Sequence, residues 1–267
     1  MLKKLRSINE WLLANLLILG CTIYMYALLK KEISGFLGSL IGYIVIGVFL
    51  ITIGLLLWVV PSESNILSSG YAGIDPLFVL APWVFMFLIP AVSMRSFAEE
   101  KKTGTIELLL TRPLSDLEII LAKYLACIVL VILSLLPTLV YYFSVSILGS
   151  PPGNLDNGRT WGSYLGLIFL ASGFASIGVF ASCISGNQIV SFIIAVILCF
   201  ICYTGFGFVG QYLSSGMLGN FVQSMGISLH YSSMSRGVID TRDVLYFASI
   251  STAFILMTRT SLESRKW

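Results

Sequence analysis

Long apolar runs separated by short polar segments dominate this chain. A helix that crosses a membrane needs about 20 mostly apolar residues in a row. Six stretches reach or approach this length, with the last one borrowing flanking residues: 40–60, 76–97, 119–148, 161–184, 189–213 and 243–260. The runs are continuous and do not alternate with polar positions, which favours helices over the strands of a barrel. The pattern therefore predicts an all-α polytopic bundle with six transmembrane helices.

Composition supports a membrane protein and excludes several soluble classes. Of the 267 residues, 57% are hydrophobic and 11% are charged, whereas an average soluble domain is about 25% charged. This balance excludes an ordinary cytosolic enzyme, a disordered protein and a nucleic-acid binder. The five cysteines all lie in apolar stretches, and an odd count without framework spacing predicts no disulfide set. Cys199 and Cys202 are interpreted as small apolar helix residues, with a redox or metal pair as the alternative.

The distribution of basic residues predicts the orientation of the bundle. With six spans and both termini in the cytoplasm, ten Lys and Arg residues from Lys30 onward lie on the cytoplasmic side and three lie outside. This asymmetry follows the positive-inside rule. Residues 261–267 are then a cytoplasmic tail.

The first 39 residues are interpreted as cytoplasmic or interfacial. The run Trp11–Leu29 is a seventh candidate span, but its insertion would place the basic residues before it outside the cell. A cleaved signal peptide is one alternative, and a true start at Met25 is another, which would make residues 1–24 an extension. Residues 25–39 are expected to form an interfacial helix that carries Lys30, Lys31 and Glu32.

The fourth and fifth spans contain no ionisable side chain of the kind that marks ion pathways. Between Arg159 and Arg236 the sequence has no Asp, Glu, Lys or Arg. Ionisable residues inside a membrane are costly and usually functional. Their absence argues against a proton-coupled secondary transporter and against a charge-lined channel. A chain with one histidine also offers no convincing set for an intramembrane enzyme.

Charged residues gather between the second and third spans, in residues 98–118. The charges at its start are expected to continue the second span into water, and Gly104 to end that helix. A short apolar helix follows, and Pro113 stops it. Ser115 then caps the next helix, with Glu118 three residues on completing a capping box. Such a short helix between charged flanks indicates a docking element, or alternatively a loop that packs on its own membrane domain.

Residues 94–124 resemble the cytoplasmic signature of permeases of the type-2 exporter family of ABC transporters. That signature has a Glu-rich entry, a Gly-Thr, a run of leucines, and then a Pro, a Ser and a Lys that lead into the next span. Here it is carried by Glu99, Glu100, Gly104, Thr105, Leu108–Leu110, Pro113, Ser115 and Lys123. More narrowly, residues 25–267 resemble the gliding-motility-associated ABC transporter permease subunit of Bacteroidetes, in stretches such as residues 80–95 (LAPWVFMFLIPAVSMR) and 235–246 (SRGVIDTRDVLY).

The resemblance implies a non-catalytic subunit of an ATP-driven exporter in the inner (cytoplasmic) membrane, with no metal and no cofactor. Its implied partners are an ATP-binding cassette ATPase subunit, a second permease chain (the same or a paralogue), an auxiliary motility subunit and membrane lipid. The residues implied to contact the ATPase are Glu99, Glu100, Lys101, Lys102, Thr103, Gly104, Thr105, Glu107, Leu108, Leu109 and Pro113, together with the interfacial Lys30, Lys31 and Glu32. The chain has no G-x-x-x-x-G-K-[ST] phosphate loop, which agrees with ATP hydrolysis in a separate subunit.

Two alternatives to this function remain at the level of sequence. One is a permease of the same type for another export task, such as lipid, polysaccharide, drug or metal-site maturation. The other is a secondary transporter or a channel.

Two further features bear on packing. The resemblance implies an outer helical hairpin within residues 214–242, with a soluble loop as the alternative. Asp240, Arg242 and Asp243 are expected to pair locally at the start of the sixth span. Small residues line one face of the fourth span: Ala171, Ala175, Gly178 and Ser182. They are interpreted as a seam within the chain, with a dimer or gating seam as the alternative.

Overall fold

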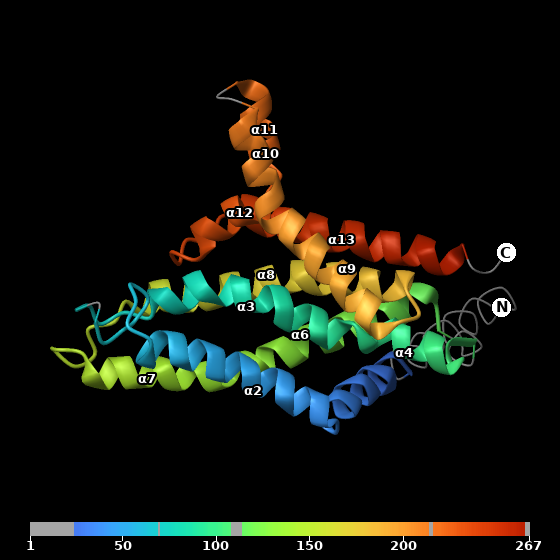
Figure 1. The fold of residues 1–267 in the computed structure, drawn as a ribbon, viewed down its shortest axis with the longest axis horizontal. Helices are drawn as coiled ribbons and strands as arrows, with labels where there is room; N and C mark the ends of the chain where they lie inside the picture. The colour runs from blue at the N-terminus through green and yellow to red at the C-terminus, as the bar shows by residue number, and fades with distance from the viewer. Residues whose placement is uncertain (1–23, 69, 108–113, 214–215, 265–267) are drawn as a thin grey trace, which may run out of the picture.

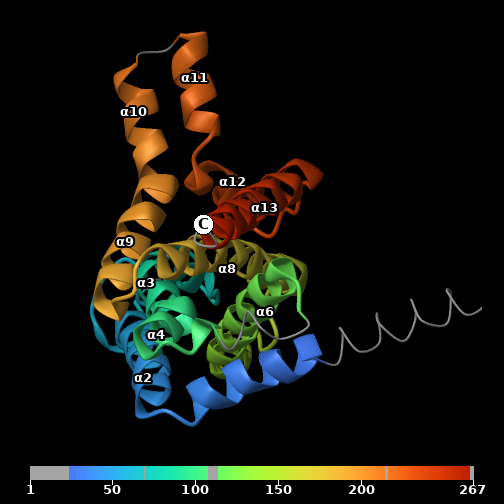
Figure 2. The same cartoon turned by 90° about the vertical axis from the view of Figure 1, so that its right-hand side faces the viewer.

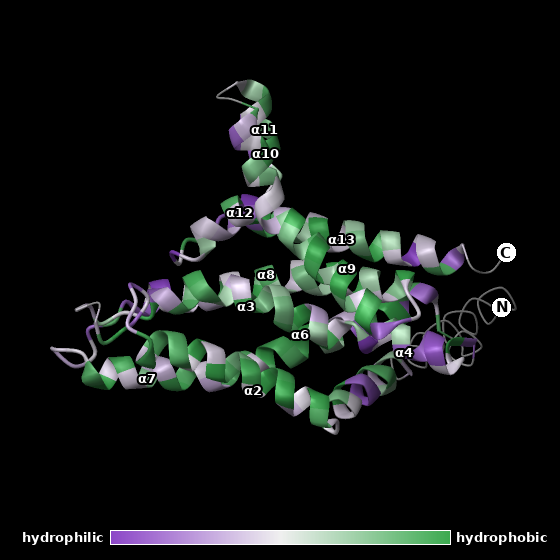
Figure 3. Ribbon diagram, viewed as in Figure 1, coloured by the Kyte–Doolittle hydropathy of each residue, from purple (hydrophilic) through white to green (hydrophobic). Residues whose placement is uncertain are grey.

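The computed structural model describes residues 24–68, 70–107, 114–213 and 216–264, and in these ranges the chain is helical and contains no strand. Among the described residues, six helical segments are long and apolar enough to cross a membrane, which confirms the predicted all-α bundle. They run side by side, except that the end of the fifth turns away from the others, and hydrophilic residues gather toward the two ends of the bundle (Figures 1 and 3). The segments are Leu40–Val59, Asp75–Thr103, Asp116–Leu148, Asn157–Ile184, Gln188–Tyr212 and Thr241–Glu263.

Several of these segments are built from more than one helix. An N-terminal helix over residues 24–37 precedes them. The elements in chain order are α2 (Leu40–Gly54), η1 (Leu55–Val59), α3 (Asp75–Ser93), α4 (Arg95–Thr103), α6 (Asp116–Leu135), η2 (Leu136–Thr138), α7 (Leu139–Leu148), α8 (Asn157–Ile184), α9 (Gln188–Phe200), η3 (Ile201–Gly205), α10 (Phe206–Tyr212), α11 (Met217–Ser224), α12 (Ile227–Met234) and α13 (Thr241–Glu263).

Helix α8 is the centre of the bundle, where it contacts α3, α6, α9 and α13 (Figure 2). The small residues on its face are all buried. A Cβ atom added at Gly178 would collide with the side chain of Ser93 in α3. Small residues let two helices approach closely in a membrane, where apolar contact with lipid is equally available. The small face of α8 is therefore a packing seam within the chain, which agrees with the interpretation of the sequence.

A proline in the second span explains one contact between distant elements. Pro82 lies inside α3 and has no N–H, so the carbonyl of Phe78, four residues earlier, loses its helical partner. The buried hydroxyl of Tyr231 in α12 donates a hydrogen bond of 2.7 Å to that carbonyl. In a membrane such a carbonyl must be satisfied within the protein. The proline thus creates the acceptor that fixes α12 against the bundle.

Helices α10 and α11 form a hairpin that projects sideways from the other helices (Figures 1 and 2). Its two helices meet at glycines: a Cβ atom on Gly210 would lie 3.0 Å from the carbonyl oxygen of Gly219. The large apolar side chains of the hairpin are exposed, among them Phe208, Tyr212 and Phe221. The hairpin differs from the range expected for it, residues 214–242, because its first helix, α10, is the end of the fifth span.

Replacing Gly162 by Ala should lower the free energy of unfolding by about 1–3 kcal/mol, the usual cost of overpacking. A Cβ atom at Gly162 in α8 would lie 2.5 Å from the carbonyl oxygen of Gly237, whose own φ of +81° ties it to its turn. Gly47 in α2 is the matched control, because a Cβ atom there meets nothing within 4 Å. Thermal unfolding in detergent, followed by intrinsic fluorescence, should show a lower midpoint for Gly162→Ala alone. Equal midpoints for the two variants would contradict this close approach.

Candidate functional site

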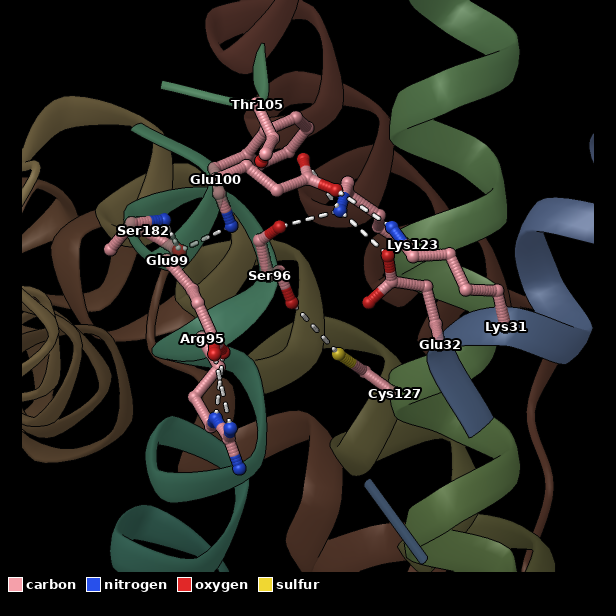
Figure 4. Close-up of polar contacts among 12 residues, drawn as sticks. Lys31, Glu32, Arg95, Ser96, Glu99, Glu100, Thr105, Lys123, Cys127 and Ser182 are labelled. Atoms are coloured by element: carbon pink, nitrogen blue, oxygen red, sulfur yellow. Dashed lines mark hydrogen bonds and ion pairs between the residues drawn. The ribbon is translucent and has the colours of Figure 1, made fainter. Parts of the chain in front are cut away.

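Charged side chains from three separate segments meet at the end of the bundle where the second span continues into α4. They come from the N-terminal helix, from α4 and from the start of α6 (Figure 4). The segment between α4 and α6, residues 104–115, is the one that the sequence indicates as a docking element, and we call it the docking segment. The contacts at this end of the bundle attach the docking segment to the spans.

Lys123 of α6 is the centre of the cluster, and only 1% of its side chain is exposed. Its ammonium lies 2.8 Å from the Glu32 carboxylate of the N-terminal helix and 3.0 Å from the Glu100 carboxylate of α4. It also donates to the carbonyl of Ser96 at 2.5 Å and lies 5.0 Å above the ring of Phe97. A buried charge is tolerated only when it is paired and hydrogen-bonded. We call Lys123, Glu32 and Glu100 the Lys123 triad.

Glu100 has a second cationic neighbour on the solvent side. Lys31 lies 3.4 Å from its other carboxylate oxygen, and 66% of the Lys31 side chain is exposed. The Glu100 carboxylate therefore bridges one buried and one exposed ammonium. Only the buried contact is expected to contribute much to stability, because exposed ion pairs contribute at most about 1 kcal/mol.

Arg95, the first residue of α4, links this helix to the first span. Its guanidinium donates two hydrogen bonds to Glu99, of 2.9 and 3.2 Å. It donates a third, of 3.3 Å, to the Ser39 hydroxyl, which is the N-cap of α2 and accepts from the backbone N–H of Gly42. The start of α4 is thereby attached to the start of the first span.

Ser182 of α8 caps the start of α4 from another span. The backbone N–H groups in the first turn of a helix have no partner within it. The Ser182 hydroxyl accepts from the N–H groups of Phe97 and Ala98, at 2.9 and 3.1 Å, and donates to the carbonyl of Met94 at 3.0 Å. Helix α4 is therefore bound at its first turn to the central helix of the bundle.

The local signals at both ends of the docking segment act as the sequence predicts. Helix α4 ends at Thr103, and Gly104 follows with φ +72°, a left-handed conformation that suits glycine. The Thr103 hydroxyl turns back to the carbonyl of Glu99 at 2.9 Å. Ser115 and Glu118 form the expected capping box at the start of α6.

The predicted site residues differ in exposure, and Glu32, Glu99 and Lys101 are partly buried. Lys102, Thr103, Gly104, Thr105 and Glu107 are exposed beyond the triad, as are Lys30 and Lys31 on the N-terminal helix. Leu108, Leu109 and Pro113 lie outside the described residues. Glu100 corrects an expectation, because its side chain is only 11% exposed and does not extend into water. Its negative charge turns inward to neutralise Lys123.

The role of Lys123 was not expected from the sequence, although a signal for it was present. A lysine two turns into an apolar helix is an ionisable residue near the membrane, and such residues have a partner nearby. The sequence does not predict that Glu32 is its partner, because Glu32 lies 91 residues away along the chain.

A cavity of about 380 Å³ opens between the N-terminal helix, α4 and α6. The members of the triad line its polar side, and Phe36, Val92 and Leu130 line its apolar side. Within the described residues, no group of three or more His, Cys, Asp and Glu is arranged to hold a metal ion. The charges in this region neutralise one another, so the arrangement holds the N-terminal helix, α4 and α6 together.

Most of the chain matches the model of a known family. A family model described as ABC-2 family transporter protein matches residues 60–257. This range runs from the end of the first span through most of the sixth span. A search of curated proteins found no match to the chain.

Replacing Lys123 by Met should lower the free energy of unfolding by about 3–5 kcal/mol, because it leaves two partly buried carboxylates facing each other. Adding Glu32→Gln and Glu100→Gln should recover most of this loss, because the neutral amides remove the repulsion. Glu99→Gln is the control, since the Arg95–Glu99 pair is more exposed and should matter by at most about 1 kcal/mol. Chemical denaturation in detergent measures all four proteins. A triple variant no more stable than Lys123→Met would contradict the electrostatic role of the triad.

Proposed function

Because the chain belongs to the ABC-2 family of transporter proteins, we propose that it is the permease subunit of an exporter whose ATP is hydrolysed by a separate ATP-binding cassette subunit. The match to residues 60–257 carries this proposal, since it includes the docking segment and both spans that flank it. A second permease chain, the same or a paralogue, completes the membrane part. Both termini then lie in the cytoplasm, and the bundle lies in the inner membrane.

The ATPase binds at the end of the bundle that carries α4. The exposed residues from Lys102 to Thr105, with Glu107, form the described part of this docking surface. Lys30 and Lys31 add positive charge from the neighbouring N-terminal helix. Charge complementarity sets the orientation and the rate of such an encounter. Leu108 and Leu109 supply the apolar part of the contact, as the family resemblance implies.

The contacts around α4 support a mechanical form of coupling. Helix α4 is attached to α8 through Ser182, to α2 through Arg95, and to α6 and the N-terminal helix through the Lys123 triad. A displacement of the docking segment therefore moves several spans together. ATP can drive export through these contacts only if the ATPase binds two arrangements of the bundle with different affinity.

The narrower part of the proposal places the chain in a transporter of the gliding-motility machinery of Bacteroidetes, with an auxiliary motility subunit as a further partner. The resemblance of residues 25–267 to that branch supports it. Export of another cargo, such as a lipid or a polysaccharide, uses the same docking surface and differs only in the cargo and the partner subunits.

The class is tested by purifying the tagged chain from its own membranes in mild detergent and identifying the co-purifying chains by mass spectrometry. A stoichiometric ATP-binding cassette subunit is expected, together with a second permease chain. A motility-linked protein in the same complex supports the narrower proposal, and a complex without one favours another cargo. No ATPase across several detergents and after crosslinking would overturn the proposed function.

Gly104→Pro should reduce the ATPase activity of the reconstituted complex to the rate of the isolated ATPase subunit. Proline fixes φ near −65°, so it cannot adopt the +72° that ends α4 and aims the docking segment. Leu109→Glu should have the same effect by placing a charge in the apolar contact. Gly70→Pro is the control, because Gly70 has the same backbone conformation, φ +71°, in the loop before α3. All variants must insert and purify like wild type, and stimulation retained in Gly104→Pro and Leu109→Glu would contradict this docking surface.

A further inference from the structure

His230, the single histidine of the chain, lies in α12 between two hydrogen-bond acceptors from different helices. Its Nδ1 atom is 2.7 Å from a carboxylate oxygen of Asp243 in α13. Its Nε2 atom is 3.0 Å from the backbone carbonyl oxygen of Ser224, the last residue of α11. The ring therefore joins α11 to α13.

The protonation state of the ring decides whether both contacts are hydrogen bonds. An ionised carboxylate and a backbone carbonyl only accept, and a neutral imidazole has a single N–H. A neutral ring can donate to one of them and presents a lone pair to the other. A ring with a proton on both nitrogens donates to both. We propose that His230 is a proton-binding site whose occupation clamps α11 to α13 and so fixes the base of the α10–α11 hairpin.

Two further contacts surround the ring. Its plane stacks on Tyr246 of α13, with centroids 3.8 Å apart, and a cation is stabilised on an aromatic face. The carbonyls of Ser224 and Met225 are at the C-terminal end of α11, where the helix dipole also favours positive charge. The Tyr246 hydroxyl donates to the Met225 carbonyl at 2.6 Å, so the stacked pair holds two adjacent carbonyls of that helix end.

The other titratable groups near the ring do not replace Asp243. Helix α11 has no titratable side chain. In η3 the Cys202 thiol lies near the Tyr246 phenol and not between the two acceptors. Asp240, at the start of α13, caps the backbone N–H of Arg242, and this hydrogen bond holds the pKa of its carboxyl below the usual value. Of the local pairing expected among Asp240, Arg242 and Asp243, the structure shows Asp240 interacting with Arg242. Asp243 instead faces His230, with 9% of its side chain exposed.

The direction of the pH effect follows from the geometry. Protons bind more tightly to the clamped arrangement, so acid favours it and alkali releases one of the two contacts. Asp243 lies at the end of α13 opposite to the docking end. In the proposed orientation the proton comes from the side of the membrane opposite to the cytoplasm, whereas the clamp itself does not depend on the ATPase assignment.

The single histidine allows a direct measurement. The full chain, with a histidine-free affinity tag and ¹⁵N-labelled histidine, is placed in phospholipid nanodiscs and followed by NMR from pH 5 to pH 9. The ¹⁵N signals of one residue then report which ring nitrogens carry protons. Asp243→Asn should need more acid than wild type to reach the doubly protonated ring, because it loses the anionic acceptor. Asp240→Asn is the matched control, since asparagine caps a helix equally well and the residue does not contact His230. The same titration midpoint in wild type and Asp243→Asn would overturn the proposal.

A distance measurement tests the clamp itself. Spin labels at Asn220→Cys in α11 and Ser249→Cys in α13, both exposed positions, are introduced after the native cysteines are replaced. The distance distribution should be narrow in acid and broaden in alkali, with its midpoint at the pH of the NMR titration. His230→Gln should give the broad distribution at every pH, because glutamine cannot take up the second proton. A distribution that does not change with pH in wild type would overturn the clamp, and this outcome leaves the permease assignment intact.

Discussion

The buried ammonium of Lys123 is the constraint on which the rest of this end of the molecule depends. A charge with 1% of its side chain exposed needs anionic partners within contact distance, and here they come from the N-terminal helix and from α4. Satisfying it fixes three segments relative to one another and turns Glu100 inward. The segment proposed to bind the ATPase therefore leaves from a rigid junction of helices. The exposed residues of this region begin at Lys102, two residues after Glu100 of the triad.

The same requirement, that buried polar groups be satisfied, also determines which helices lie together. Apolar contacts discriminate little between helix faces in a membrane, because lipid is as apolar as leucine. Polar groups with a single good partner do discriminate. Ser182 takes up the unpaired N–H groups of α4, and Tyr231 takes up the carbonyl that Pro82 releases. A few such contacts specify an arrangement that hydrophobic burial alone would leave open.

Helix α8 connects the two ends of the molecule. At one end its Ser182 holds the first turn of α4, and toward the other end its Gly162 lies against Gly237, in the turn between α12 and α13. Its 28 residues form one uninterrupted helix between these contacts. The first turn of α4 and the turn between α12 and α13 therefore contact the same continuous helix.

The features that can be predicted from the amino-acid sequence are those that depend on neighbouring residues. Runs of about 20 apolar residues gave the six spans, the left-handed preference of glycine gave the end of α4 at Gly104, and the Ser115–Glu118 spacing gave the capping box. The three-dimensional fold is needed to find the partners of Lys123, the inward turn of Glu100 and the pairing of Asp243 with His230. The physical reason is that these pairs depend on which helix faces meet. A nearly uniform apolar pattern does not predict which helix faces meet, because lipid and protein solvate an apolar face equally well.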